Sequence, residues 1–95
     1  MKEYGLEMIR VGKRIRNIRE IRGYTRDYLA EKSEISSKYL YEIETSGKDF
    51  SARILYRLAK NLNVSMKYIM VGECETEFIS DSKLKLLKII EEYEL

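Results

Sequence analysis

Two candidate helix starts that lie close together are the feature that most restricts how this chain can fold. Thr25 can cap a helix that runs to about Lys32, and Ser36 can cap the next helix. Only three residues, 33–35, join the two helices. So short a turn does not suit antiparallel packing, but it does suit two helices that cross steeply. We therefore expect the second helix to be presented outward, with its N-terminal residues foremost.

Apolar spacing predicts another helix before this pair. Isoleucines recur every three residues between positions 15 and 21, and Gly23 then follows as a typical C-terminal stop. Because glycine weakens a helix, Gly5 and Gly12 allow a start as late as Val11, and the alternatives for residues 1–10 are an extension of this helix, an arm towards DNA or a loose segment.

After the pair, Ser51 can cap a fourth helix and Ser65 a short fifth one. Their apolar residues fall at helical spacing: Ile54, Leu55, Leu58, Ala59 and Leu62 in the fourth, and Met66, Ile69 and Met70 in the fifth. Four tyrosines are expected to be in the core or half-buried: Tyr24, Tyr28, Tyr56 and Tyr68. No segment has convincing strand alternation and no repeat is present, so we expect an all-α domain.

Composition argues against catalysis and against a metal site. The chain has no histidine, which is the commonest general base and metal ligand, and only one cysteine, Cys74. A single cysteine gives neither a disulfide framework nor a zinc cluster, so we expect no enzyme and no cofactor.

The chain has 95 residues, enough for one compact core. No membrane span or secretory signal is recognisable, which favours a cytoplasmic protein.

The net charge of +2 conceals an uneven distribution. Of the 18 Lys and Arg and the 16 Asp and Glu, the first 72 residues contain 15 and 9, which leaves that part at +6. Six of these bases lie in the predicted first helix: Arg10, Lys13, Arg14, Arg16, Arg19 and Arg22. The asymmetry indicates either a polyanionic partner or a solvated basic face.

The predicted third helix has a polar and aromatic face. If Leu40 and Ile43 point inward, the opposite face is formed by Ser37, Lys38, Tyr41 and Glu42. A short, steeply crossed helix pair with such a face has helix-turn-helix geometry, in which the second helix contacts base edges in the major groove of double-stranded DNA. The alternative is a set of ordinary solvated side chains.

The stretch YTRDYLAEKSEISSKYLYEIE resembles the helix-turn-helix of the phage-repressor (Cro/repressor, or Xre-like) family, and the similarity extends from about Val11 to Gly72. It implies a five-helix lambda-repressor-like DNA-binding domain over residues 1–72, with the motif at about 25–45. The family's base-contacting positions are matched by Ser37, Lys38 and Glu42. Lys38 best suits guanine acceptors, Glu42 a cytosine amino group, and Tyr41 a thymine methyl group or a phosphate.

Phosphate contacts, which set the register of a protein on DNA, are expected from Arg26, Ser36, Tyr39, Lys48 and Arg53. For Tyr39 the alternative is packing on the fourth helix. The resemblance also implies a structural ion pair between Arg19 and Glu44, which would be costly to break from one side if buried.

The chain departs from the family at two positions of the motif. Arg26 replaces the usual glutamine at the start of the second helix, which should strengthen a phosphate contact. Glu34 replaces the usual glycine of the turn, where the left-handed conformation would cost roughly 1 kcal/mol.

Beyond Gly72 the resemblance ends. Residues 73–80 are expected to be an acidic connector, and residues 81–95 an additional C-terminal amphipathic helix. The apolar surface of this helix is wider than one packed face needs, which favours a homodimer, although a helix folded wholly onto its own domain is the alternative.

Together these features predict a sequence-specific DNA-binding transcriptional regulator, a repressor that binds an inverted-repeat operator as a homodimer and is nucleoid-associated when bound. One alternative is an antitoxin-like module whose C-terminal helix binds a partner protein. Another is a basic protein that coats DNA without sequence preference. No membrane association and no small-molecule ligand are indicated.

Overall fold

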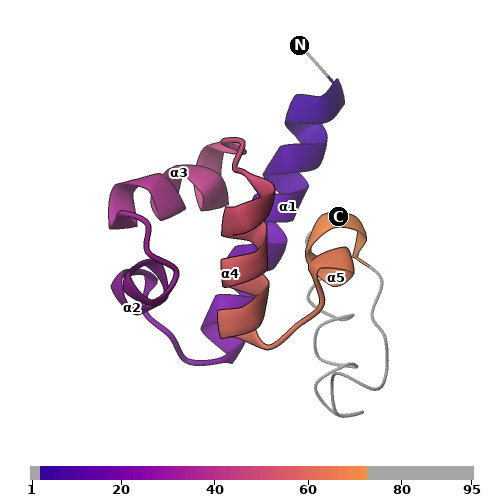
Figure 1. Ribbon diagram of the computed structural model, residues 1–95. Coiled ribbons are helices and arrows are strands. Elements are labelled where there is room, and N and C mark those ends of the chain that lie inside the picture. Colours follow the sequence, from indigo (N-terminus) through magenta and orange to yellow (C-terminus); the bar gives the residue numbers. More distant parts are fainter. Residues whose placement is uncertain (1–2, 73–95) are drawn as a thin grey trace.

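The structure is a computed structural model that describes residues 3–72, and this part contains five helices and no strand (Figure 1). The helices are α1 (Glu3–Ile21), α2 (Arg26–Lys32), α3 (Ser37–Ser46), α4 (Ala52–Leu62) and α5 (Met66–Val71). The expected all-α class and the expected helix order are confirmed. The predicted acidic connector and C-terminal helix lie outside the described residues.

Four helices begin where small polar residues were predicted to cap them. The caps are Thr25, Ser36, Ser51 and Ser65, each with an extended backbone. In every case the side-chain oxygen accepts a hydrogen bond from the backbone N–H three residues later, at 2.9–3.2 Å. Each cap satisfies one of the free N–H groups at the helix start, which fixes where these helices begin.

Of the alternatives for the start of the first helix, the late start at Val11 is wrong and the extension is correct from Glu3 on, where α1 begins. The prediction treated Gly12 as a weak point, but this residue is buried where α1 crosses α3. A Cβ atom at Gly12 would collide with the backbone carbonyl of Ile43. The glycine therefore permits close approach of two helices, and burial of Val11 and Ile15 beside it stabilises the helix through packing.

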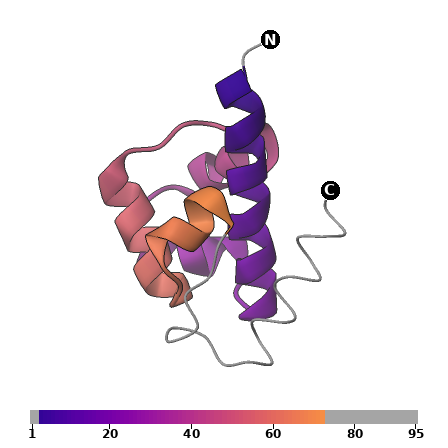
Figure 2. The ribbon, with the colours of Figure 1, turned by 90° about the vertical axis from the view of Figure 1, so that its right-hand side faces the viewer.

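The core lies between α1 and the other four helices. Its fully buried members include Ile15, Ile18, Leu29, Leu40, Ile43, Leu58, Leu62, Tyr68 and Ile69. Figure 2 shows α5 alongside α1, and Figure 1 shows α2 and α5 on different sides of α1. The inward faces of α3, α4 and α5 thus converge on one helix, which holds α3 in place from behind.

The expected burial of tyrosines is only partly correct. Tyr68 is buried and Tyr24 is half-buried against the core, but Tyr28 and Tyr56 are 44% and 55% exposed. The error at Tyr56 has a geometric cause, since this residue lies two positions before Leu58 and therefore on the opposite side of α4. An aromatic residue in a helix is buried only when it falls on the packed face.

Two basic side chains, one in α1 and one directly after it, cap neighbouring helices. Arg22 donates from Nε to the carbonyl of Leu62 at 2.8 Å, at the C-terminal end of α4. Arg14 donates from Nη1 to the carbonyls of Ile69 at 3.1 Å and Met70 at 3.4 Å, at the end of α5. Cations satisfy free carbonyls at helix C-termini. These two arginines, part of the charge asymmetry that indicated either a polyanionic partner or a solvated basic face, therefore have a structural use.

Candidate nucleic-acid interface

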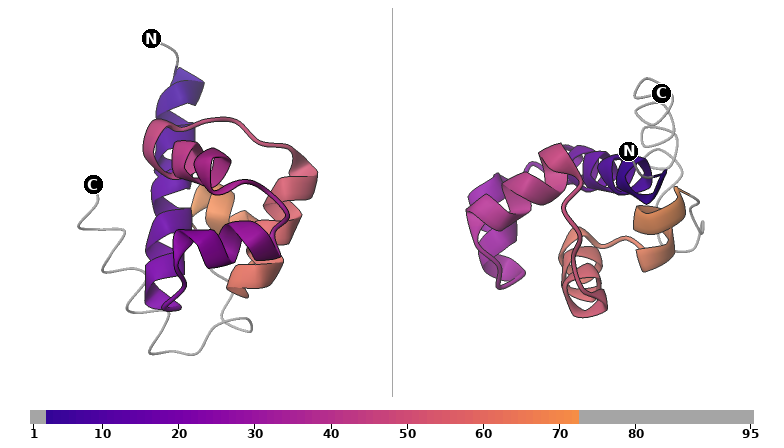
Figure 3. Two further views of the ribbon diagram at one scale, coloured as in Figure 1. Left: turned by 90° about the vertical axis from the view of Figure 1, so that its left-hand side faces the viewer. Right: turned by 90° about the horizontal axis from the view of Figure 1, so that it is seen from above.

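The two helices of the predicted motif lie together on one side of the molecule. They are at the left of Figure 1, and the left panel of Figure 3 looks directly onto them. The turn between them depends on Glu34, whose φ of 63° confirms the expected left-handed conformation. The N–H of Ile35 donates to the carbonyl of Ala30 at 3.0 Å, which closes the turn onto the end of α2.

Side chains of α4 support this turn from behind. Ser33 is fully buried, and its hydroxyl oxygen accepts a hydrogen bond from Nδ2 of Asn61 at 3.1 Å. Nη2 of Arg57 lies 3.4 Å from Oε1 of Glu34. No local sequence pattern indicates either contact, because both join residues far apart in the chain. Together they fix the angle at which α3 leaves the turn.

Arg19 and Glu44 form a buried, two-pronged ion pair. Nε of Arg19 lies 2.8 Å from Oε2 of Glu44, and Nη2 lies 3.1 Å from Oε1. The Glu44 side chain is 0% exposed and that of Arg19 is 8% exposed. The remaining Nη1 of Arg19 donates to the carbonyl of Tyr24 at 2.9 Å. The pair thereby ties α1 to the end of α3 and to the segment that precedes α2.

Arg26 is a second partner of the same carboxylate, which sequence reasoning missed. Its Nε lies 3.1 Å from Oε1 of Glu44, and its guanidinium carbon lies 5.1 Å from the ring centroid of Tyr41. Two guanidinium groups therefore share one carboxylate, and this cluster carries a net charge of +1. The Arg26 side chain is 32% exposed, so it forms the solvent-facing side of the cluster.

The four residues predicted to contact bases lie on the side of α3 away from the core, because Leu40 and Ile43 are buried. Two of the four are tied to neighbouring residues. The Ser37 hydroxyl donates to Oδ1 of Asp27 at 2.5 Å, and Oε1 of Glu42 lies 3.3 Å from Nζ of Lys48.

Lys38 and Tyr41 are the more accessible of the four. Lys38 is exposed and has no ion pair with any residue of the described part. The Tyr41 side chain is exposed on the same helix. The face therefore offers one unpaired cation and one aromatic ring to a partner.

The residues predicted to contact phosphate have more varied environments. Ser36 is exposed and caps α3, and Arg53 is exposed in the first turn of α4 with no ion-pair partner among residues 3–72. The Tyr39 ring packs partly against the core, and its hydroxyl donates to the carbonyl of Asp49 at 2.9 Å. Tyr39 thus bonds to the α3–α4 connection, which neither reading of this residue anticipated.

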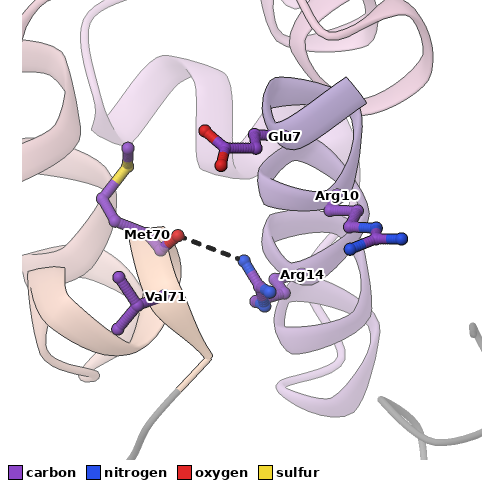
Figure 4. Close-up of a pocket in the computed structure, with 5 residues that line it drawn as sticks. All are labelled: Glu7, Arg10, Arg14, Met70 and Val71. Atoms are coloured by element: carbon purple, nitrogen blue, oxygen red, sulfur yellow. Dashed lines mark hydrogen bonds between the residues drawn. The ribbon is translucent and has the colours of Figure 1, made fainter. Parts of the chain in front are cut away.

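A separate pocket of about 390 Å³ lies between α1 and α5 (Figure 4). Its lining consists of Glu7, Arg10, Arg14, Met70 and Val71. Figure 1 shows α5 on the opposite side of the molecule from α2 and α3, so this pocket does not belong to the helix-turn-helix surface.

None of the helices within residues 3–72 combines the length and the apolar character needed to cross a bilayer.

Comparisons with known proteins point to the same motif. A family model described as "Helix-turn-helix domain" matches residues 12–75. Among solved structures, the restriction-modification controller protein C.AhdI from Aeromonas hydrophila has a TM-score of 0.64 at 22% identity, covering 67% of this chain and 97% of that one. No curated protein sequence matches the chain.

A structure of the clp gene regulator ClgR from Corynebacterium glutamicum has a TM-score of 0.63 at 29% identity, covering 68% of this chain and 84% of that one. A second ClgR structure has a TM-score of 0.66 at 24% identity and covers 93% of this chain and 86% of that one. These matches confirm the resemblance to phage-repressor-like helix-turn-helix proteins and the lambda-repressor-like fold expected from it.

Proposed function

Because the chain belongs to the helix-turn-helix domain family, we propose that it is a sequence-specific DNA-binding repressor that occupies an inverted-repeat operator as a homodimer. The observation that carries this proposal is the division of α3 into two faces. Leu40 and Ile43 are buried, while Lys38 and Tyr41 are exposed on the outward side. An α-helix of this kind fits the major groove of B-DNA, where each base pair has a distinct pattern of donors and acceptors.

In this proposal Lys38 contacts guanine, since an ammonium group donates well to the N7 and O6 acceptors. Ser37 and Glu42 also contact bases in this proposal. Their side-chain conformations are set by neighbouring residues, because Asp27 binds Ser37 and Lys48 binds Glu42. The hydroxyl of Ser37 donates to Asp27, which leaves its oxygen available as an acceptor.

Phosphate contacts surround these base contacts. Ser36 and Arg26 lie at the starts of α3 and α2, where free backbone N–H groups favour an anion. Arg53 and Lys48 add cations on the α4 side of the motif, and the Lys48 ammonium lies 5.8 Å from the centroid of the Tyr39 ring. The surplus charge of the Arg26 cluster also favours a phosphate.

The proposed homodimer matches the geometry of an inverted-repeat operator. Two recognition helices about 34 Å apart match successive major grooves, and a two-fold dimer matches an inverted repeat. C.AhdI is described as a controller protein and ClgR as a gene regulator, which supports a regulatory role for this chain. We propose residues 81–95 as the dimerisation element, because the amphipathic helix that their sequence predicts has a broad apolar surface.

Selection of bound sequences from a randomised duplex pool at physiological salt tests this function. We expect an inverted repeat, and we expect Lys38→Ala to relax the preference at one position of each half-site. Lys60→Ala is the matched control, because Lys60 is an exposed lysine in the last turn of α4. If no sequence is enriched, base recognition by α3 is wrong, and a protein partner of residues 81–95 becomes the better explanation.

A further inference from the structure

Tyr41 is the residue of the outward face of α3 that can make an apolar contact. Ser37 and Glu42 are engaged in polar contacts, and Lys38 ends in a charge. The Tyr41 side chain is 51% exposed although its ring is large and mainly apolar. An exposed aromatic ring on a surface that meets a partner offers much contact area at low entropic cost.

The Arg26 guanidinium lies against this ring. Its central carbon is 5.1 Å from the ring centroid, within the range of an attractive cation–π contact. One side of the ring is therefore occupied by a group of α2, although Tyr41 itself belongs to α3. This contact restricts the side-chain rotation of Tyr41.

Arg26 is in turn fixed from the core. Its Nε lies 3.1 Å from Oε1 of Glu44, which is fully buried and also bound by Arg19. The contacts form a continuous series from Arg19 of α1 through Glu44 and Arg26 to Tyr41 at the surface. Because Arg26 is anchored at Glu44, the position of the Tyr41 ring is determined before any ligand arrives.

We propose that Tyr41 recognises the 5-methyl group of a pyrimidine in the major groove, and that Arg26 is the positioning residue that holds its ring for this contact. The inference rests on the proposed DNA-binding function and specifies the ligand of one residue in it. The thymine methyl is the apolar group that base edges present in the major groove, and 5-methylcytosine carries the same group. A ring that is already held in place loses little freedom on binding, which favours such a small contact.

Deoxyuridine substitution tests the contact directly, because deoxyuridine lacks only the methyl group of thymine. Each thymine of the selected operator is replaced in turn, and the Kd is measured for the full-length protein. We expect one position in each half-site at which the wild type binds about fourfold more weakly, the effect of one buried methyl group. Tyr41→Ala should abolish this difference, whereas Tyr41→Phe, which keeps the ring, should retain it.

Arg26→Lys separates positioning from phosphate binding. Lysine keeps the positive charge but lacks the planar guanidinium that contacts both Glu44 and Tyr41. A lost phosphate contact would weaken binding to the thymine and deoxyuridine operators equally. Loss of positioning should instead shrink the fourfold difference between them to less than about twofold. Arg53→Lys is the control and should leave the difference unchanged.

The outcomes distinguish this inference from the proposed function. If the wild type binds a specific sequence but no thymine is sensitive to deoxyuridine, methyl recognition is wrong. If the sensitivity exists but Arg26→Lys preserves it fully, Tyr41 acts without Arg26. If the wild type selects no sequence at all, the proposed function itself is wrong. Thermal unfolding of each variant is the control that separates these changes in Kd from loss of the folded structure.

Discussion

The basic side chains in and directly after α1 differ from the lysine on the outward face of α3 in whether their charge is bound within the molecule. Three arginines bind within the molecule: Arg14 of α1 and Arg22 directly after it cap other helices, and Arg19 of α1 binds Glu44. On α3, Lys38 has no ion-pair partner within residues 3–72. The region with more positive charge is therefore not the region that we expect to meet DNA. The position of a cation relative to helix ends and buried carboxylates matters more than its count.

Among the variants that test this comparison, the one that removes Glu44 should lose the most stability. Glu44→Ala leaves the buried Arg19 without its carboxylate and frees Arg26 as well. Breaking a buried ion pair from one side costs about 3–5 kcal/mol in unfolding free energy. Urea unfolding measures the loss, and Glu20→Ala in the exposed Arg16–Glu20 pair is the control, with an expected effect below about 1 kcal/mol. Equal losses in the two variants would mean that the Glu44 site is hydrated and not a structural clamp.

Gly12→Ala should be the next most damaging change. The added methyl group would meet the carbonyl of Ile43 where α1 crosses α3, so the helices must separate. Overpacking of this kind costs about 1–3 kcal/mol, against a gain of roughly 1 kcal/mol when alanine replaces glycine in an open helix. Thermal unfolding should show a lower Tm. A raised Tm would show that α1 and α3 can separate without loss.

A third comparison pairs Arg22→Met with Lys38→Ala. Arg22→Met removes two hydrogen bonds to the end of α4 and should lower stability by about 1–2 kcal/mol while leaving DNA affinity unchanged. Lys38→Ala should leave Tm unchanged and weaken operator binding about tenfold, the value of one base contact. Urea unfolding and DNA titration on both variants measure the two effects. The opposite pattern would assign DNA binding to the segment at the end of α1 and contradict the distinction between the two regions.

Local sequence signals predicted most of the fold but little of the interface geometry. The caps at Thr25 and Ser36 follow from neighbouring residues, and the left-handed Glu34 is expected from the family resemblance, so all three could be found without a structure. The contact of Arg26 with Tyr41 depends on how α2 and α3 pack, and no local pattern indicates it. Gly12 shows the same limit, because its role depends on a helix that lies about thirty residues later in the chain.

Glu34→Gly should produce the smallest effect and the only gain in stability. Glutamate at a φ of 63° is strained by roughly 1 kcal/mol, and glycine relieves this strain. The change also removes the 3.4 Å contact with Arg57, but Glu34 is 71% exposed there, and exposed pairs contribute less than about 1 kcal/mol. The gain should therefore dominate and raise Tm by a few degrees in thermal unfolding, roughly the shift produced by 1 kcal/mol or less. Arg57→Ala isolates the ion pair, and a Glu34→Gly variant that melts no higher than the parent would mean that this pair outweighs the backbone strain.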